Sequence, residues 1–402
     1  MLAALASGFI LSMSFRTIIA ISADPLAGEL GASAQVLGAL AGVFHIAFAL
    51  AQPVVGVSLD RHGPRRVVLV TFSLAVIGSV VSAYANNLTV LVIGQSLIGF
   101  GCSPALLAAM LFISQRYPIE RFAAVSGAVL SAGGAGMLIT GTPLAWVIDT
   151  FTWRAGFLVL TALAAASWLA VYLLVDEESS PSDTQEQSLG EALQGLASIV
   201  RQPHTLGICC LAATSYAAFL ALRGLWLGPL LAERHDFSVI EVGHVAFAMS
   251  VFGVFGPLFF GRIDPGGHAR RTLILSCSVG YIGLFGLHAI GIGSYLEIAL
   301  LIITGFFGGY VSLQYADLRA SYPEDMTGRA LSVFTMAMFS GVAGVQWLSD
   351  IAASLSPSLG VDPLMAALLT VSLLLAFGTF AFWRLPQPPG LKNKLTQPTT
   401  SR

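Results

Sequence analysis

Two arginines lie inside long apolar stretches of the sequence, where a charged side chain is costly. Arg16 falls in the stretch from residue 3 to 25, and Arg223 in the stretch from 205 to 231. An arginine near the centre of a membrane helix costs roughly 2.5 to 3.5 kcal/mol on insertion scales, so it normally faces a water-filled cavity or a partner. A guanidinium group binds carboxylate or phosphate through paired hydrogen bonds that lysine cannot reproduce. The two arginines therefore predict an anion site.

A structural alternative gives the same arginines no ligand. Arg16 then pairs with Asp24 or another buried carboxylate, and Arg223 extends along apolar surface to water. The positions of the two arginines favour the anion site, because Arg16 lies nine residues before Pro25 and Arg223 lies six before Pro229. The difference is about one helical turn, which keeps both side chains on a similar face of corresponding helices.

Other polar side chains also lie within or beside apolar stretches. Gln95 could hydrogen-bond a solute or simply a neighbouring helix. His45 is a candidate proton carrier because histidine changes charge near physiological pH, with a neutral packing role as the alternative. The candidate substrate-binding residues are Arg16, Arg223, Gln95, Tyr216, Gln314 and Gln346, and the candidate proton sites are His45 and Asp24.

The elements that must position these residues are membrane helices. Hydrophobic residues make up 56% of the 402 residues and charged residues 10%, too few to cover a water-soluble surface. A helix needs about 20 apolar residues to cross a bilayer. Twelve stretches meet this requirement: 3–25, 35–58, 67–85, 88–112, 122–147, 154–175, 205–231, 239–260, 272–291, 295–317, 329–353 and 363–384.

The positive charges in the connections predict the orientation of these spans. With the N-terminus in the cytoplasm, fifteen of the 19 Lys and Arg residues fall in inner connections or the tail, and only Arg154 and Arg234 in outer ones. Basic connections stay in the cytoplasm during insertion. We therefore expect a multi-pass protein of the cell inner (plasma) membrane with both termini cytoplasmic. The two remaining basic residues are Arg16 and Arg223.

The two halves of the sequence resemble each other at an offset of about 205 residues. Pro25-Leu26 matches Pro229-Leu230, and Tyr117-Pro118 matches Tyr322-Pro323. Such parallel repeats are a known transporter plan, and duplication implies a binding site between the halves. The predicted domains are an N-terminal six-helix bundle at 1–176, a cytoplasmic linker at 177–203, a C-terminal six-helix bundle at 204–386 and a cytoplasmic tail at 387–402.

The connection after the second span carries the most specific motif. It reads Gly-Val-Ser-Leu-Asp-Arg-His-Gly-Pro-Arg-Arg from residue 56 to 66 and resembles the G-x-L-x-D-R-x-G-R-R signature of the major facilitator superfamily. Gly56 permits close helix approach, and Gly63 allows a tight turn. The resemblance implies an all-α membrane fold of twelve transmembrane helices in two pseudo-symmetric six-helix bundles.

The same resemblance implies a conformational latch in this connection. Asp60 would form charge-assisted hydrogen bonds in one access state and lose them in the other. The alternative is a basic turn that only fixes topology. The predicted latch residues are Gly56, Asp60, Arg61, Gly63, Arg65 and Arg66.

The sequence departs from the family pattern at two places. The second copy of the motif reads Gly-Arg-Ile-Asp-Pro-Gly-Gly from residue 261 and lacks the Asp-Arg pair, so a second latch is not expected. In the fourth span, Gln95 stands where many members of the superfamily carry an arginine linked to proton coupling. The usual proton relay therefore does not transfer to this sequence.

Several classes of function are excluded or disfavoured. A net charge of −2 and a pI near 6.4 give no basic field for nucleic acid. The four cysteines have no metal or disulfide spacing, and neither a phosphate-cradling loop for ATP nor a catalytic constellation is present. We expect no enzyme activity, no cofactor and no metal site.

The sequence thus predicts a secondary active transporter, working as a monomer in the lipid bilayer, that moves a small anion by alternating access. A coupling proton is a candidate driving ion. One alternative is a drug or metabolite efflux pump of the same superfamily. An alternative of another class is a membrane sensor that transports nothing.

Overall fold

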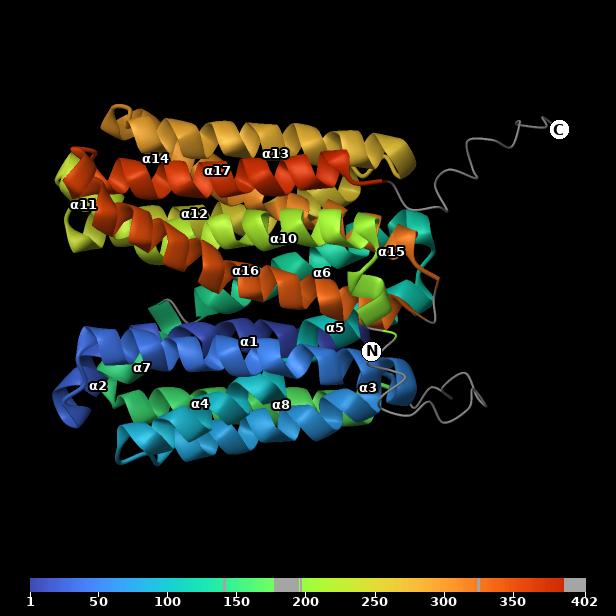
Figure 1. Ribbon diagram of the computed structural model, residues 1–402. Helices are drawn as coiled ribbons and strands as arrows, with labels where there is room; N and C mark the ends of the chain where they lie inside the picture. The colour runs from blue at the N-terminus through green and yellow to red at the C-terminus, as the bar shows by residue number, and fades with distance from the viewer. Residues whose placement is uncertain (140–141, 177–194, 196, 324–325, 387–402) are drawn as a thin grey trace, which may run out of the picture. The chain divides into compact units, whose positions relative to one another are not determined.

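The computed structural model describes residues 1–139, 142–176, 195, 197–323 and 326–386. Within these ranges the chain is helical and contains no strand (Figure 1). Most of the predicted linker at 177–203 and all of the predicted tail at 387–402 lie outside the described residues. The proposed domain boundaries therefore stay predictions.

The helices of the first half of the sequence end with Leu174. They are α1 (Leu2–Ile21), α2 (Ala23–Leu30), α3 (Ala34–Ala83), α4 (Leu88–Cys102), α5 (Ala105–Arg116), α6 (Ile119–Ile139), α7 (Thr142–Thr150) and α8 (Trp153–Leu174). The first predicted span, 3–25, is broken at Ser22, where α1 ends and α2 begins one residue later. The fourth span is α4 followed by α5.

The helices of the second half begin with Pro203. They are α10 (Pro203–Ala221), η1 (Leu222–Trp226), α11 (Leu227–His235), α12 (Val239–Arg262), α13 (Gly267–Ile290), α14 (Ser294–Phe307), η2 (Gly308–Tyr310), α15 (Val311–Ser321), α16 (Thr327–Leu355), η4 (Ser356–Leu359) and α17 (Pro363–Arg384). Consecutive segments such as α10, η1 and α11 form one long membrane stretch, Pro203–His235.

The described helices contain twelve membrane crossings. Eleven stretches are long and apolar enough to span a bilayer, and one of them, Val36–Ala83, has 48 residues. That is about 72 Å of helix at 1.5 Å per residue, roughly twice what a crossing needs. Gly63 interrupts this stretch with φ 74° and ψ 164°, a conformation that only glycine adopts easily. The stretch is therefore two helices, and the predicted count of twelve is confirmed.

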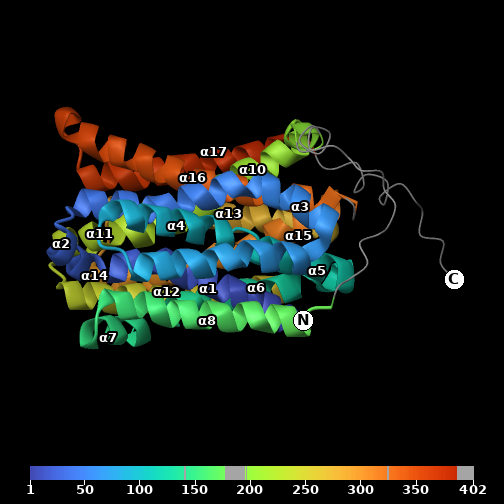
Figure 2. The same cartoon turned by 90° about the horizontal axis from the view of Figure 1, so that it is seen from below.

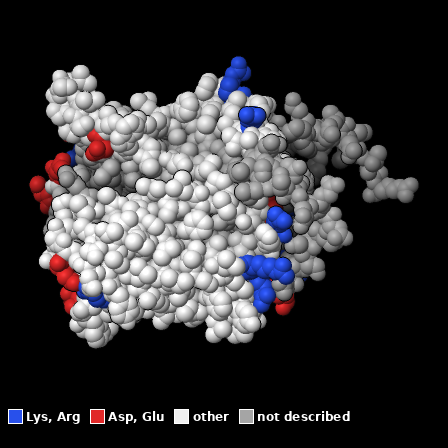
Figure 3. Space-filling model, turned by 60° about the horizontal axis from the view of Figure 1, so that its bottom comes forward, with Lys and Arg blue, Asp and Glu red and all other residues white. Residues whose placement is uncertain are grey.

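The surface is that of a protein in lipid. Large apolar side chains are widely exposed, among them Leu50 at 74%, Val70 at 71% and Phe377 at 63%. On the face drawn in Figure 3, the Lys, Arg, Asp and Glu side chains gather at two ends and leave the broad middle uncharged. A bilayer core tolerates this arrangement, because apolar side chains face the hydrocarbon and charges stay near water.

The chain forms two compact units. Unit 1 comprises Met1–Tyr117, Ala132–Gln194 and Glu324–Ser332, and unit 2 comprises Pro118–Ser131, Gly195–Pro323 and Val333–Arg402. In unit 1, α3 packs along α4 and α8, and α1 packs along α5 and α8, as Figure 2 shows from below. In unit 2, α17 packs along α10 and α13, and α12 packs along α14. The start of α16 belongs to unit 1.

Candidate functional site

Arg16 lies in the interior of unit 1, on the buried side of α1. Its side chain is 8% exposed, and its guanidinium carbon lies 4.7 Å from the ring centre of Phe48 and 5.5 Å from that of Phe44. Both rings come from α3. A guanidinium over an aromatic face gains cation–π attraction and is held in a defined orientation. The arrangement fixes a positive charge inside a membrane unit.

Ser12 and Cys102 are polar neighbours of this guanidinium. Ser12, one turn before Arg16 on α1, lies 3.5 Å from its Nη2 and also hydrogen-bonds the thiol of Cys102. Gln52 donates to the carbonyl oxygens of Phe48 at 3.3 Å and Ser103 at 3.2 Å. The Arg16 site thus combines a cation with hydroxyl and thiol groups, which suits a ligand that carries both an acid and polar substituents.

Gln95 is the most unusual polar residue near this site. It is fully buried on α4, and neither its amide oxygen nor its amide nitrogen has a hydrogen-bond partner among the described residues. It lies one turn before Gly99, which packs on the backbone of Phe44, and two turns before Cys102 on the same helix face. A buried amide without partners is costly, so a solute or water is expected there.

Arg223 lies in unit 2 on a single π-helical turn, η1, which the sequence did not reveal. Its Nε donates to the hydroxyl of Ser250 on α12 at 2.8 Å, and its side chain is half-buried. Single π turns within α-helices often occur at functional sites, because the extra residue redirects the side chains around it. The turn, Leu222–Trp226, includes Arg223 and precedes Pro229, so sequence spacing alone does not give the helix face on which Arg223 lies.

The remaining candidate binding residues of unit 2 do not form one cluster. Gln314 on α15 is buried, and its Nε2 donates to Ser215 at 3.0 Å. Tyr216, the next residue on α10, is half-buried and packs edge-on against Phe339 at 5.5 Å. Gln346 is half-buried on α16. Gln314 therefore has a partner within the unit, and a ligand role for Gln314, Tyr216 and Gln346 stays a prediction.

The candidate proton sites lie in different surroundings. His45 is half-buried on α3, where its Nδ1 lies 3.2 Å from the carbonyl oxygen of Ala41 and its ring packs on Phe44 at 5.4 Å. It adjoins the Arg16 site. Asp24 is exposed in the first turn of α2. Their role in proton transfer stays a prediction.

Asp60 binds the first turn of α16, to which Arg329 belongs. Its Oδ2 accepts from the backbone N–H of Arg329 and from the Nε of the same residue, both at 3.1 Å, and the carboxylate also accepts from the N–H of Gly328. The first N–H groups of a helix lack partners within it and attract an anion. Asp60 therefore caps α16 from a position 269 residues earlier in the sequence.

Two glycines make this approach possible. A Cβ atom at Gly328 would overlap the Asp60 carboxylate, and a Cβ atom at Gly56 would overlap the side chain of Ser332. Arg65 of the same connection donates to the carbonyl oxygen of Tyr172 at 3.0 Å, while Arg61 and Arg66 are exposed. The predicted latch motif thus has the hydrogen-bonding geometry of a latch, and its switching role stays a prediction.

The second copy of the motif is bonded differently. Asp264 pairs with Arg270 through two hydrogen bonds of 2.7 and 2.6 Å, and Arg271 pairs with Asp317 at 3.2 Å. Asp317 on α15 is 1% exposed, and Arg271 of α13 supplies its cationic partner.

Each unit also has an arginine that ties helix ends together. In unit 1, Arg154 bonds Glu29 at 2.6 Å and the carbonyl oxygen of Ala85 at 2.9 Å, while Trp153 donates to Glu29 at 2.7 Å. Hydrogen bonds from Arg154 and Trp153 lower the pKa of Glu29 to about 2. Glu29 therefore stays ionised at physiological pH. The sequence placed Arg154 in an outer connection but did not reveal Glu29 as its partner.

The corresponding arginine of unit 2 is Arg234. It bonds Asp362 at 2.8 Å and the carbonyl oxygens of His288 at 2.8 Å and Ala289 at 3.0 Å. Partial burial raises the pKa of Asp362, but hydrogen bonds from Arg234 and the Met365 N–H outweigh it and lower that pKa overall. In unit 1 the acidic residue, Glu29, precedes its arginine in the sequence, whereas in unit 2 Arg234 precedes Asp362. Aligning the two halves of the sequence therefore could not reveal this ion pair.

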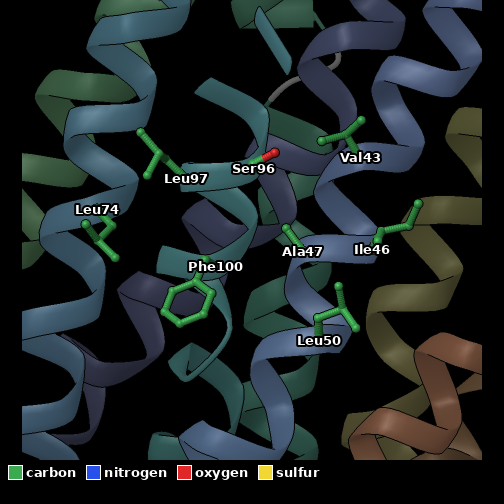
Figure 4. A pocket seen from close by; sticks show the side chains of 8 residues that line it. All are labelled: Val43, Ile46, Ala47, Leu50, Leu74, Ser96, Leu97 and Phe100. Atoms are coloured by element: carbon green, nitrogen blue, oxygen red, sulfur yellow. The ribbon is translucent and has the colours of Figure 1, made fainter. Parts of the chain in front are cut away.

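A cavity of about 550 Å³ in unit 1 is not suited to an anion. Figure 4 shows its lining, in which Val43, Ile46, Ala47 and Leu50 of α3 and Leu74 of its second segment face Ser96, Leu97 and Phe100 of α4. The Ser96 hydroxyl is turned back to the Val92 carbonyl at 2.7 Å. With Ile46 61% and Leu50 74% exposed, the cavity is an apolar groove of the surface rather than a polar site.

Comparisons with known proteins agree with this fold. A model described as Major Facilitator Superfamily matches residues 4–345. The hexuronate transporter of Escherichia coli (strain K12) is 23% identical over 418 residues, which cover 96% of this chain and 93% of the relative. The probable L-galactonate transporter of the same strain is 24% identical over 265 residues, covering 62% of this chain and 57% of the relative.

A solved structure is similar over nearly the whole chain. The proton:xylose symporter XylE bound to 6-bromo-6-deoxy-D-glucose has a TM-score of 0.77 to this chain and covers 98% of each chain. Its sequence identity to this chain is 14%, so the similarity supports the fold alone.

Proposed function

The chain belongs to the Major Facilitator Superfamily, and from this premise we propose that it moves a small organic anion across the membrane by alternating access. It is a multi-pass membrane transporter of a small-molecule substrate and not an enzyme. We further propose that it works as a monomer in the inner membrane with both termini cytoplasmic, since its connections concentrate Lys and Arg on one side.

The observation that carries the proposal is the buried guanidinium of Arg16. It is held over Phe44 and Phe48 within a membrane unit, where a charged side chain usually serves a function. A guanidinium in this position can bind a carboxylate ligand through paired, charge-assisted hydrogen bonds. The relatives support the same class, because two of them are named for hexuronate and L-galactonate, which are sugar acids.

Gln95 fits a substrate that is hydroxylated as well as acidic. A sugar hydroxyl both donates and accepts, so it can satisfy either atom of the buried amide. A site built to hydrogen-bond a hydroxyl rejects analogues that lack it, because the amide is then left without partners. We therefore propose a polyhydroxylated carboxylate as the first substrate class to examine.

Ligand-induced stabilisation of the purified protein tests this proposal. A ligand present at 100 times its dissociation constant stabilises the folded state by about 2.7 kcal/mol. Glucuronate is expected to raise the unfolding temperature of the full chain in detergent, whereas glucose, which lacks the carboxylate, leaves it unchanged. Arg16→Gln is expected to remove the glucuronate effect.

The rival functions predict other patterns in the same measurement. An efflux pump for drugs responds to apolar cations and little to loss of Arg16. A sensor binds its ligand tightly but moves no solute in liposomes. Equal stabilisation by glucose and glucuronate, or none by any anion of a sugar-acid panel, contradicts the proposed substrate class.

A further inference from the structure

A buried cluster of three polar residues lies in unit 2, apart from the candidate substrate residues. His288 near the end of α13 and Glu297 and Thr304 on α14 are each 0% exposed. No role was predicted for His288 from the sequence, and the structure places it near the end of α13 with a fully buried side chain. Glu297 and Thr304 are two turns apart on one helix face, which turns both toward His288.

Both ring nitrogens of His288 are engaged. Its Nδ1 bonds the Oε1 of Glu297, and its Nε2 lies 2.9 Å from the hydroxyl oxygen of Thr304. The second carboxylate oxygen accepts from the backbone N–H of Ile292 at 3.3 Å, and the Thr304 hydroxyl lies 2.8 Å from the carbonyl oxygen of Leu300. Every polar atom of the cluster therefore has a partner.

The number of hydrogens available to His288, Glu297 and Thr304 defines the protonated form of this cluster. Thr304 has a single hydroxyl hydrogen, and in one form of the cluster it is donated to the Leu300 carbonyl, 2.8 Å away. Its oxygen must then accept from Nε2–H of His288. With Nδ1 facing a carboxylate oxygen, the pair shares one further proton and is neutral as a whole, written as an imidazolium beside a carboxylate.

The same residues can also satisfy the form with one proton fewer. If the Nε2 proton leaves to water, the Thr304 hydroxyl rotates from Leu300 and donates to the bare Nε2. The Nδ1–H still donates to Glu297, and the Leu300 carbonyl keeps its acceptor place in the helix. No buried donor or acceptor loses its last partner, which is rare for a group that changes charge in a protein interior.

We propose that His288 and Glu297 bind and release one proton during transport, with the Thr304 hydroxyl as the hydrogen-bond switch between the two forms. This inference rests on the proposed transport function and names its coupling ion. It places the proton in unit 2 rather than at His45 or Asp24. The ligand of the site is a proton exchanged with water.

The other charged groups around the cluster are paired or exposed. The His288–Glu297 pair is therefore the buried group whose charge can change. Arg234 of α11 bonds the carbonyl oxygen of His288 but is neutralised by Asp362 at the start of α17. From α12, Glu241 and His244 are both exposed. On α13, Tyr281 is buried two turns before His288 and lies edge-on to Phe285 at 5.2 Å. Gly293 in the α13–α14 connection is exposed, and its carbonyl oxygen accepts from the backbone N–H of Glu297 at 3.0 Å.

Nuclear magnetic resonance of ¹⁵N-histidine in the full chain tests the site without any substrate. His288→Gln identifies the signals, which are followed from about pH 5 to 9, the range that brackets ordinary histidine titration. We expect Nε2 to change from a protonated to an unprotonated shift while Nδ1 stays protonated. Thr304→Ser, which keeps the hydroxyl, should preserve this pattern, and Thr304→Val should abolish it.

Two results overturn the inference. One is a His288 signal that stays constant over the whole range, as a permanent structural pair would give. The other is an unchanged titration in Thr304→Val. Anion transport in liposomes gives the functional measurement. A pH gradient should raise anion accumulation by the parent protein and have no effect on accumulation by His288→Gln. Anion exchange without a pH gradient should persist in His288→Gln. If the parent moves no anion, the proposed function fails, yet the resonance result still decides the proton site.

Discussion

Arg16→Lys is expected to reduce anion transport strongly in a protein that still folds and inserts. Lysine keeps the charge but loses the planar fork that stacks on Phe44 and Phe48 and binds a carboxylate through two hydrogen bonds. Loss of one charge-assisted hydrogen bond costs about 1.5 to 3 kcal/mol, so uptake should fall roughly 10- to 150-fold. Uptake of labelled glucuronate into liposomes, at equal protein content, measures the effect.

A matched substitution separates a ligand role from a general effect of removing an arginine. Arg384 is exposed at the end of α17, and Arg384→Gln should transport at the parental rate. Arg223→Gln is expected to behave like Arg16→Lys, although its bond to Ser250 can moderate the loss. Parental transport by correctly inserted Arg16→Lys would assign Arg16 a structural role.

Gly328→Ala is expected to break the contact between Asp60 and α16 and to slow transport about tenfold. The added Cβ atom overlaps the carboxylate of Asp60, which must then give up the N–H groups of Gly328 and Arg329. A latch that stabilises one access state by 1.4 kcal/mol changes its population ratio about tenfold. The initial rate of glucuronate exchange in liposomes gives the measurement.

The same helix supplies the control for this prediction. A Cβ atom at Gly344 of α16 meets nothing within 4 Å, so Gly344→Ala should leave the rate unchanged. Asp60→Asn should resemble Gly328→Ala, because it removes the negative charge that faces the helix N-terminus. Equal rates in the parent, Gly328→Ala and Asp60→Asn would show that the motif fixes topology and does not act as a latch.

The sequence predicted those features that depend on local composition. Span number follows from the length of apolar stretches, and the 48-residue helix was correctly divided because Asp60, Arg61 and Gly63 mark a connection. The partner of Asp60 could not be predicted, because Arg329 is 269 residues away in the sequence and only the fold brings the two residues together. The sequence did show that Asp60 needs a hydrogen-bond donor.

Two other features were missed for physical reasons. A membrane helix is apolar on all sides, so its periodicity does not reveal which face is buried, and the burial of His288 was not predicted. The available signal was Glu297, a second ionisable residue nine positions later in an apolar segment. The π turn at Leu222–Trp226 adds one residue to a helical turn without changing composition, so only Gly224 hinted at irregularity.

Counterflow in liposomes tests the central claim most directly. Vesicles containing the purified full chain are loaded with unlabelled glucuronate and diluted into labelled glucuronate. We expect the vesicles to accumulate label transiently above the level in protein-free vesicles. We expect no such accumulation when glucose replaces glucuronate, and none in the double variant Arg16→Gln and Arg223→Gln. Counterflow that persists in that double variant, or that is as fast for glucose as for glucuronate, would contradict an anion carrier built on these arginines.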